Sequence, residues 1–148
     1  MAMTEDYLFD PVTTEHIEAQ EKFASRVERY WGVKCTRMKD KSRLDYAIEK
    51  DGFLSAWIEL KCRSHVFGTF PEYMIELKKW NALRDYTATT NLKAFIGVGF
   101  TDGDFWVNLD DISEWRVAYG GRTDRNCKKD VGSMVYFDIK FFKQWKTA

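Results

Sequence analysis

Two charged residues stand in an otherwise largely apolar stretch near the middle of the chain. In the run Phe53–Cys62, Glu59 and Lys61 are two positions apart. Residues two apart in a strand point to the same face, so the carboxylate and the ammonium would project together. Burying such charges costs free energy unless they are paired, and a segment selected only for folding would favour Val or Ile there. The pair therefore indicates a chemical site.

A third charged residue is expected to join them from the neighbouring strand. Asp45 lies in the strand-like run 43–49, and Lys50-Asp51-Gly52 predicts a tight hairpin that leads into Phe53–Cys62. Two carboxylates that converge at a sheet offer oxygen ligands to a hard divalent cation, above all Mg²⁺. Lys61 could then orient a water or stabilise charge on a phosphate. The alternative is a purely structural salt bridge of Lys61 with Asp45 or Glu59.

A second copy of the triplet Glu-Leu-Lys serves as an internal comparison. Glu76-Leu77-Lys78 falls in a helix predicted from about Glu72 to Arg84, with Pro71 at its first turn. In a helix, residues two apart lie about 200° apart around the axis and cannot share a site. Only the Glu59 copy has the strand geometry and an upstream Asp.

The elements around these residues follow from periodicity and turn signals. A helix is predicted from Thr13 or Thr14 to a stop at Gly32, with one apolar face. The strand-like runs are Val33–Met38, 43–49, Phe53–Cys62, 92–100, 105–109, 115–119 and 134–139. The run 92–100 is almost continuously apolar, which is typical of a strand covered on both faces. The order predicts an α/β or α+β fold in which helices flank a sheet.

Length and composition indicate one domain over residues 1–148. At 148 residues and 17.5 kDa, with 45% hydrophobic and 31% charged residues, the chain can form its own core. No segment approaches a membrane span or a secretory signal. Three widely spaced cysteines, Cys35, Cys62 and Cys127, favour neither a disulfide framework nor a zinc site. We therefore expect a cytoplasmic protein in a reducing compartment that does not associate with membranes.

The net charge of zero conceals a segregation of charge along the chain. Residues 1–30 carry seven acidic and three basic residues, whereas residues 113–148 carry eight basic and four acidic ones. The loop 120–133 contains four bases that could contact the phosphates of a nucleic acid or another polyanion, namely Arg122, Arg125, Lys128 and Lys129. Trp115 and Tyr119 could stack on unpaired bases, or could belong to the core.

The arrangement of Asp45, then Glu59-Leu60-Lys61 fourteen positions later, between two helices, resembles the PD-(D/E)XK nuclease superfamily. It is similar in particular to small phage-encoded endonucleases and Holliday-junction-resolvase-like members. Leu44 stands where the literal motif has Pro. The resemblance in element order covers about residues 15–100. It implies a restriction-endonuclease-like mixed sheet, with the core order helix-strand-strand-strand-helix-strand over about 13–109 and a basic extension over 110–148.

The resemblance also implies a function and roles for individual residues. Asp45, Glu59 and the Leu60 carbonyl would hold Mg²⁺, with Mn²⁺ as a substitute, and Lys61 would be the catalytic lysine. A glutamate of the first helix would complete the site; the resemblance favours Glu21, whereas helical periodicity slightly favours Glu28. In related nucleases the second helix often presents a basic residue to the phosphate, here Lys79.

The expected activity is metal-dependent endonucleolytic hydrolysis of DNA in DNA processing or recombination. A homodimer would suit the cutting of both strands. The alternatives are a non-catalytic nucleic-acid-binding or assembly module on the same fold, and a nuclease directed at RNA.

Overall fold

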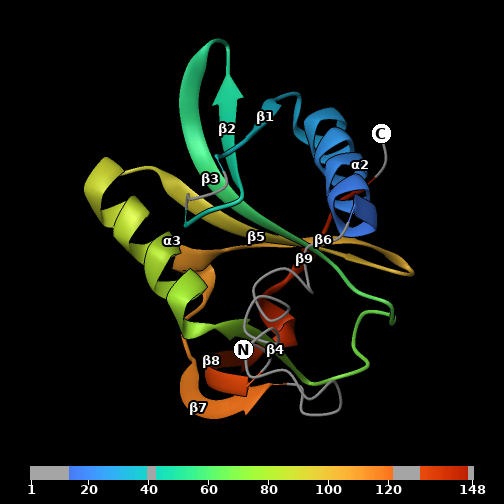
Figure 1. Cartoon of the computed structure of the whole chain (residues 1–148), viewed down its shortest axis with the longest axis vertical. Coiled ribbons are helices and arrows are strands. Elements are labelled where there is room, and N and C mark those ends of the chain that lie inside the picture. Colours follow the sequence, from blue (N-terminus) through green and yellow to red (C-terminus); the bar gives the residue numbers. More distant parts are fainter. Residues whose placement is uncertain (1–13, 40–42, 122–130, 147–148) are drawn as a thin grey trace, which may run out of the picture.

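A computed structural model describes residues 14–39, 43–121 and 131–146 of the chain. Within these ranges, two helices pack with two β-sheets (Figure 1). In chain order the elements are α2 (Thr14–Trp31), β1 (Lys34–Arg37), β2 (Tyr46–Lys50), β3 (Phe53–Cys62), β4 (Glu72–Glu76), α3 (Leu77–Thr90), β5 (Lys93–Phe100), β6 (Gly103–Asn108), η1 (Leu109–Asp111), β7 (Arg116–Gly121), β8 (Val131–Asp138), η3 (Ile139–Phe141) and β9 (Lys143–Gln144). Neither helix combines the length and apolarity needed to cross a bilayer.

The main sheet has six strands in the order β1-β2-β3-β5-β6-β9. β3 and β5 are parallel, whereas the other neighbours in this sheet are antiparallel. Such a parallel pair requires a crossover, which here contains β4 and α3. A second, antiparallel sheet has the order β4-β8-β7. The predicted mixed sheet with flanking helices is therefore confirmed.

The main sheet separates two hydrophobic clusters, one for each helix. On the α2 side, Phe23 and Val27 are fully buried with Ile58 and Leu60 of β3. On the α3 side, Trp57 belongs to a larger cluster that also contains residues of the second sheet. The alternation along β3 thus sends the odd-numbered positions 57, 59 and 61 toward α3, because successive strand residues point to opposite faces.

The hairpin between β2 and β3 has the predicted geometry. Lys50 pairs with Phe53, which leaves Asp51 and Gly52 as a two-residue loop. Both loop residues have positive φ, 53° and 83° respectively. Asp-Gly suits this turn, because Gly adopts positive φ at no steric cost and Asp tolerates it better than most residues. A β-bulge between Ile48 and Glu49 then shifts the register by one residue, and this shifted register sets β2 beside the charged part of β3.

The predicted start of the second helix is wrong. Residues Glu72–Glu76 form strand β4, which pairs with β8, and α3 begins only at Leu77. Tyr73 and Ile75 are buried, whereas Glu76 is exposed, so the segment has a period of two. Pairing with β8, a partner 60 residues later in the chain, overrides the helical signal of Pro71. The second Glu-Leu-Lys copy therefore straddles a strand and a helix.

Candidate active site

The site forms where β2 and β3 separate. The last paired residues at this end of the hairpin are Tyr46 and Ile58, and Asp45 immediately precedes Tyr46. Beyond Ile58, the edge of β3 that faces β2 meets side chains instead of a backbone. The Leu60 N–H lies 3.4 Å from Asp45 Oδ2. The separation therefore brings a carboxylate to the backbone of β3 and frees the Leu60 carbonyl from strand pairing.

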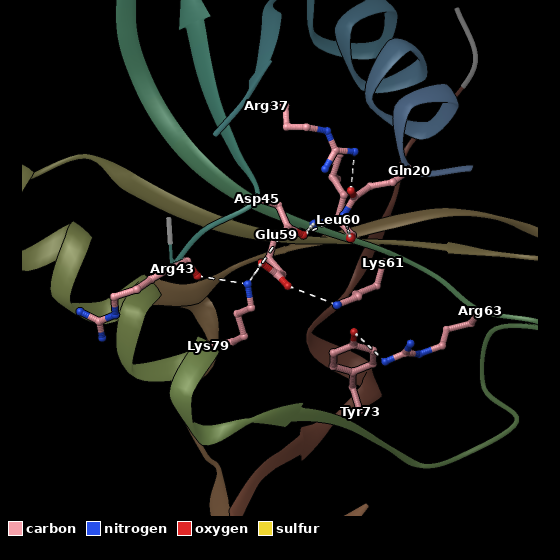
Figure 2. Close-up of polar contacts among 10 residues, drawn as sticks. All are labelled: Gln20, Arg37, Arg43, Asp45, Glu59, Leu60, Lys61, Arg63, Tyr73 and Lys79. Atoms are coloured by element: carbon pink, nitrogen blue, oxygen red, sulfur yellow. Dashed lines mark hydrogen bonds and ion pairs between the residues drawn. The ribbon is translucent and has the colours of Figure 1, made fainter. Parts of the chain in front are cut away.

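Four charged side chains converge at this point (Figure 2). The Lys61 ammonium lies 3.6 Å from Glu59 Oε2. The Lys79 ammonium lies 3.5 Å from Asp45 Oδ1 and 3.5 Å from Glu59 Oε1. β3, α3 and the residue before β2 thus bring the predicted residues Asp45, Glu59, Lys61 and Lys79 together. The site is open to solvent rather than filled by hydrophobic side chains, because Lys61 is 42% and Lys79 29% exposed.

Gln20 of α2 closes the site from the other side of the sheet. Its Nε2 donates to Asp45 Oδ2 and to the Leu60 carbonyl, with both distances 2.9 Å. Its Oε1 accepts a hydrogen bond of 2.7 Å from Arg37, which also donates to the Tyr46 hydroxyl. One amide group therefore links two of the oxygens that were predicted to hold a cation. These contacts are visible in Figure 2.

Glu59 is the most deeply buried charged group of the site. Its side chain is completely buried, and neither carboxylate oxygen has a hydrogen-bond partner within the described part of the chain. Burial and, next, the Asp45 carboxylate raise the pKa of Glu59, Lys61 and Lys79 lower it, and the net pKa of Glu59 is about 7. The carboxylate therefore lacks the donors that normally compensate its desolvation.

The neighbouring carboxylates stabilise the positive charge of Lys61. Burial lowers its pKa, but the carboxylates of Glu59 and Asp45 outweigh that effect, and the net pKa of Lys61 is raised. Its ammonium is therefore positively charged at neutral pH. A permanent cation at the mouth of the site suits the stabilisation of negative charge on a phosphate better than the uptake of a proton.

The oxygens of this site fit a hard divalent cation. Within the described residues, no cluster of three His, Cys, Asp or Glu side chains exists. The site offers two carboxylates and the Leu60 carbonyl, an all-oxygen donor set typical of Mg²⁺ with water completing the shell. The unpartnered oxygens of Glu59 are the observation that supports this fit, because a cation would supply the missing interaction.

The structure brings neither candidate for the expected glutamate of the first helix, Glu21 or Glu28, into the site. Glu21 is 60% exposed and lies 3.7 Å from Arg37. Glu28 accepts a hydrogen bond from the backbone N–H of Cys35 at the start of β1. The residue of this helix that contacts Asp45 is Gln20, one position before Glu21, because position 20 lies on the side of the helix that faces the sheet.

A sequence signal for Gln20 exists, although the family resemblance points to an acidic residue of this helix. The apolar positions Ile17, Ala24, Val27 and Trp31 continue through position 20 with the spacing of three and four that defines a helix face. Gln20 is therefore a polar interruption of the core-facing stripe. A half-buried polar residue on the core-facing stripe needs a hydrogen-bond partner, and this need is a stronger sign of a site than the charge of a flanking glutamate.

The basic residues of the C-terminal third lie outside the described residues. Arg122, Arg125, Lys128 and Lys129 belong to the segment 122–130 that is not described. Next to it, Trp115 is 44% and Tyr119 76% exposed. The guanidinium of Arg84 lies 5.1 Å from the Trp115 ring centroid. Both aromatic side chains therefore remain accessible at the surface of the second sheet.

Comparisons with known proteins agree with the geometry of the site. Residues 12–145 match the family described as "Phage putative PDDEXK endonuclease". Among solved structures, the chain is similar to Archaeoglobus fulgidus Hjc, a Holliday junction resolvase from an archaeal hyperthermophile. The TM-score is 0.58 at 9% identity, over 88% of this chain and 92% of that chain. The search among curated proteins found no match.

The likeness to Hjc at this low identity concerns the fold, whereas the family match rests on the sequence and spans nearly the whole chain. Asp45, Glu59 and Lys61, on which the resemblance of the sequence to the superfamily rests, lie close together in the structure. The chain therefore belongs to the phage PDDEXK endonuclease family, within the PD-(D/E)XK nuclease superfamily.

Proposed function

We propose that this protein is a Mg²⁺-dependent endonuclease that hydrolyses phosphodiester bonds of DNA. The observation that carries the proposal is the buried carboxylate of Glu59, which has no hydrogen-bond partner among the described residues and faces Asp45 and two lysines. A fold maintained only for binding would gain stability from replacing this group with an apolar residue. Its retention together with Asp45 and Lys61 supports catalysis.

Each side chain has a role that follows from its position. Asp45, Glu59 and the Leu60 carbonyl would hold the cation, and Gln20 would position Asp45 and the Leu60 carbonyl through its Nε2. Bound Mg²⁺ would lower the pKa of a water and neutralise charge on the phosphate oxygens. Lys61 projects beside Glu59 from the same face of β3, partly exposed, so it can orient the attacking water or stabilise the transition state.

DNA is the substrate that we propose, in agreement with the endonuclease family to which the chain belongs. Lys79 and the basic residues Arg122, Arg125, Lys128 and Lys129 would contact the phosphate backbone. Because phosphate contacts release counterions, binding should weaken steeply as salt rises. We also propose a cytoplasmic site of action, since Cys35 and Cys62 are free thiols.

The decisive experiment compares the two Glu-Leu-Lys copies. Cleavage would be followed on linear, nicked, flapped and four-way-junction DNA, and on RNA, with Mg²⁺, Mn²⁺, Ca²⁺ or a chelator. We expect Asp45→Ala and Lys61→Ala each to lower the cleavage rate by a factor on the order of 10² to 10³ while the fold persists. The matched variants Glu76→Ala and Lys78→Ala should cleave like the wild type, because both residues are exposed.

Cleavage that survives in chelator, or in Asp45→Ala, would contradict the metal-dependent mechanism. Binding of DNA without cleavage under every condition would indicate an assembly module, and a preference for RNA would indicate the other alternative. Light scattering tests whether a homodimer forms. A two-fold pair of sites would cut both strands of a duplex most simply, so we propose that the protein acts as a dimer.

A further inference from the structure

The Lys79 ammonium lies between the two acidic residues of the site. It is 3.5 Å from Asp45 Oδ1 and 3.5 Å from Glu59 Oε1. It also donates a hydrogen bond of 3.2 Å to the Arg43 carbonyl. Among the residues that the structure describes, Lys61 forms an ion pair with Glu59, at 3.6 Å, and with no other acid. Lys79 is therefore the positive group that touches both acids at once.

A cation that uses these carboxylates would approach the same ammonium. An ammonium has only donors and cannot serve as a ligand, so it contributes nothing to the coordination shell. The two positive charges of a divalent cation a few ångströms away would repel the Lys79 ammonium strongly in this partly buried site. Lys79 and the cation therefore compete for the same oxygens of Asp45 and Glu59.

The position of Lys79 on the fold allows it to leave. It is the third residue of α3, and its side chain is 29% exposed, so its ammonium can turn outward without moving the helix. The Arg43 carbonyl is its one other described contact. Once separated from the carboxylates, the ammonium needs a new anionic partner, and a DNA phosphate at the mouth of the site would provide one.

We propose that Lys79 is the internal counter-ion of the cation site. It neutralises Asp45 and Glu59 when no metal is bound, yields these oxygens on metal loading, and then binds a phosphate of the substrate. The inference rests on the proposed function, since it assumes that the carboxylates hold a cation. Metal and DNA would consequently bind with positive cooperativity, because each makes the position of Lys79 favourable for the other.

The test measures Ca²⁺ binding to the full chain by titration calorimetry, without DNA. We expect Lys79→Met to bind Ca²⁺ more tightly, on the order of tenfold, because one competing charge contact is removed. Lys78→Met is the matched control, since Lys78 is the exposed neighbour on the same helix, and its affinity should equal that of the wild type. Lys79→Gln keeps a polar side chain against Glu59 and serves if Lys79→Met does not fold.

A second measurement follows the affinity for a fluorescent DNA duplex in chelator and in Ca²⁺, with the duplex checked for integrity. In the wild type, Ca²⁺ should strengthen DNA binding, and in the Lys79 variants this gain should be several-fold smaller because the released ammonium is missing. The Lys78 variant should retain the full gain. An equal gain in wild type and Lys79 variants would overturn the transfer of Lys79 to phosphate.

The outcomes separate this inference from the proposed function. Equal Ca²⁺ affinity in the wild type and both Lys79 variants would overturn the counter-ion role and leave the cation site intact. Binding by the Lys79 variants alone would support it, since Lys79 would then exclude the cation completely. If no variant binds Ca²⁺, Mg²⁺ or Mn²⁺, the cation site itself is refuted, and the inference falls with it.

Discussion

Two acidic side chains are buried in the described part of this protein, and their surroundings differ sharply. Asp104 of β6 is 7% exposed and accepts three hydrogen bonds, two from Arg26 and one from the Tyr30 hydroxyl. Glu59 of β3 is completely buried and accepts none from the described residues. The protein itself supplies the hydrogen-bond donors of the Asp104 carboxylate, whereas the described residues supply no donor to the Glu59 carboxylate.

The difference follows from what each carboxylate connects. Asp104 links β6 to α2 through hydrogen bonds of 2.6 to 2.9 Å, so its carboxylate helps to hold the helix on the sheet. Glu59 faces two ammonium groups at 3.5 and 3.6 Å, longer than the roughly 2.7–3.2 Å of an ordinary N–H···O hydrogen bond. Buried charge with complete hydrogen bonding is typical of a structural role, and incomplete hydrogen bonding is typical of a functional site.

The largest contrast should appear when each acid loses its charge. We expect Glu59→Gln to reduce DNA cleavage by a factor on the order of 10³, because the substitution removes a ligand of the cation. Its metal-free form should unfold at the same or a higher temperature than the wild type. Cleavage assays and thermal melts check both expectations, and wild-type cleavage by Glu59→Gln would refute the functional reading of this carboxylate.

Asp104→Asn should show the opposite pattern. The substitution weakens the pair with Arg26 and leaves donors without a charged acceptor, which costs about 2–3 kcal/mol of the free energy of unfolding. The effect stays below that of a fully buried pair, since Arg26 is 36% exposed. Urea denaturation measures the loss, and cleavage below the melting temperature should be retained. If Asp104→Asn were as stable as the wild type, the structural role of Asp104 would be refuted, and with it the contrast to Glu59.

The pH dependence of stability should belong to Glu59. The pKa of Glu59 is about 7 in the folded protein, against the ordinary value of 4.5 that applies to the unfolded chain. Between these two pH values, the folded state holds a proton that the unfolded chain has released. The free energy of unfolding of the metal-free protein should therefore fall by about 2 kcal/mol as pH rises from about 5 to 8. Urea melts across this range check it, and Glu59→Gln should abolish the slope.

The smallest effect should come from completing the acidic site. Gln20→Glu places a third carboxylate against the Leu60 carbonyl and Asp45, and should tighten Ca²⁺ binding on the order of tenfold once the cation compensates the added repulsion. Glu21→Gln is the matched control, because Glu21 is exposed toward Arg37, and should leave Ca²⁺ affinity unchanged. A loss of affinity only in Glu21→Gln would restore Glu21 as the helix ligand.

Local patterns were sufficient for much of the fold. The first helix, the Asp51-Gly52 hairpin and the doubly covered strand β5 match their predicted positions closely. Each depends on neighbours within a few residues, such as an apolar stripe, a turn dipeptide or a continuous apolar run. Strand β4 was missed because its partner β8 is 60 residues away, and only that pairing makes Glu72–Glu76 extended.

The sequence by itself determined which residues carry the chemistry of β3, because alternation along a strand places Glu59 and Lys61 on one face wherever the strand lies. It also determined that Asp45 lies next to the strand paired with theirs, since the two-residue turn joins β2 to β3. The β-bulge between Ile48 and Glu49, which no turn signal encodes, then shifts the register by one residue. Only the tertiary structure decided what surrounds them. Gln20 and Lys79 come from helices on opposite faces of the sheet, and the packing of those helices, which no local spacing encodes, selects the side chains that reach the carboxylates.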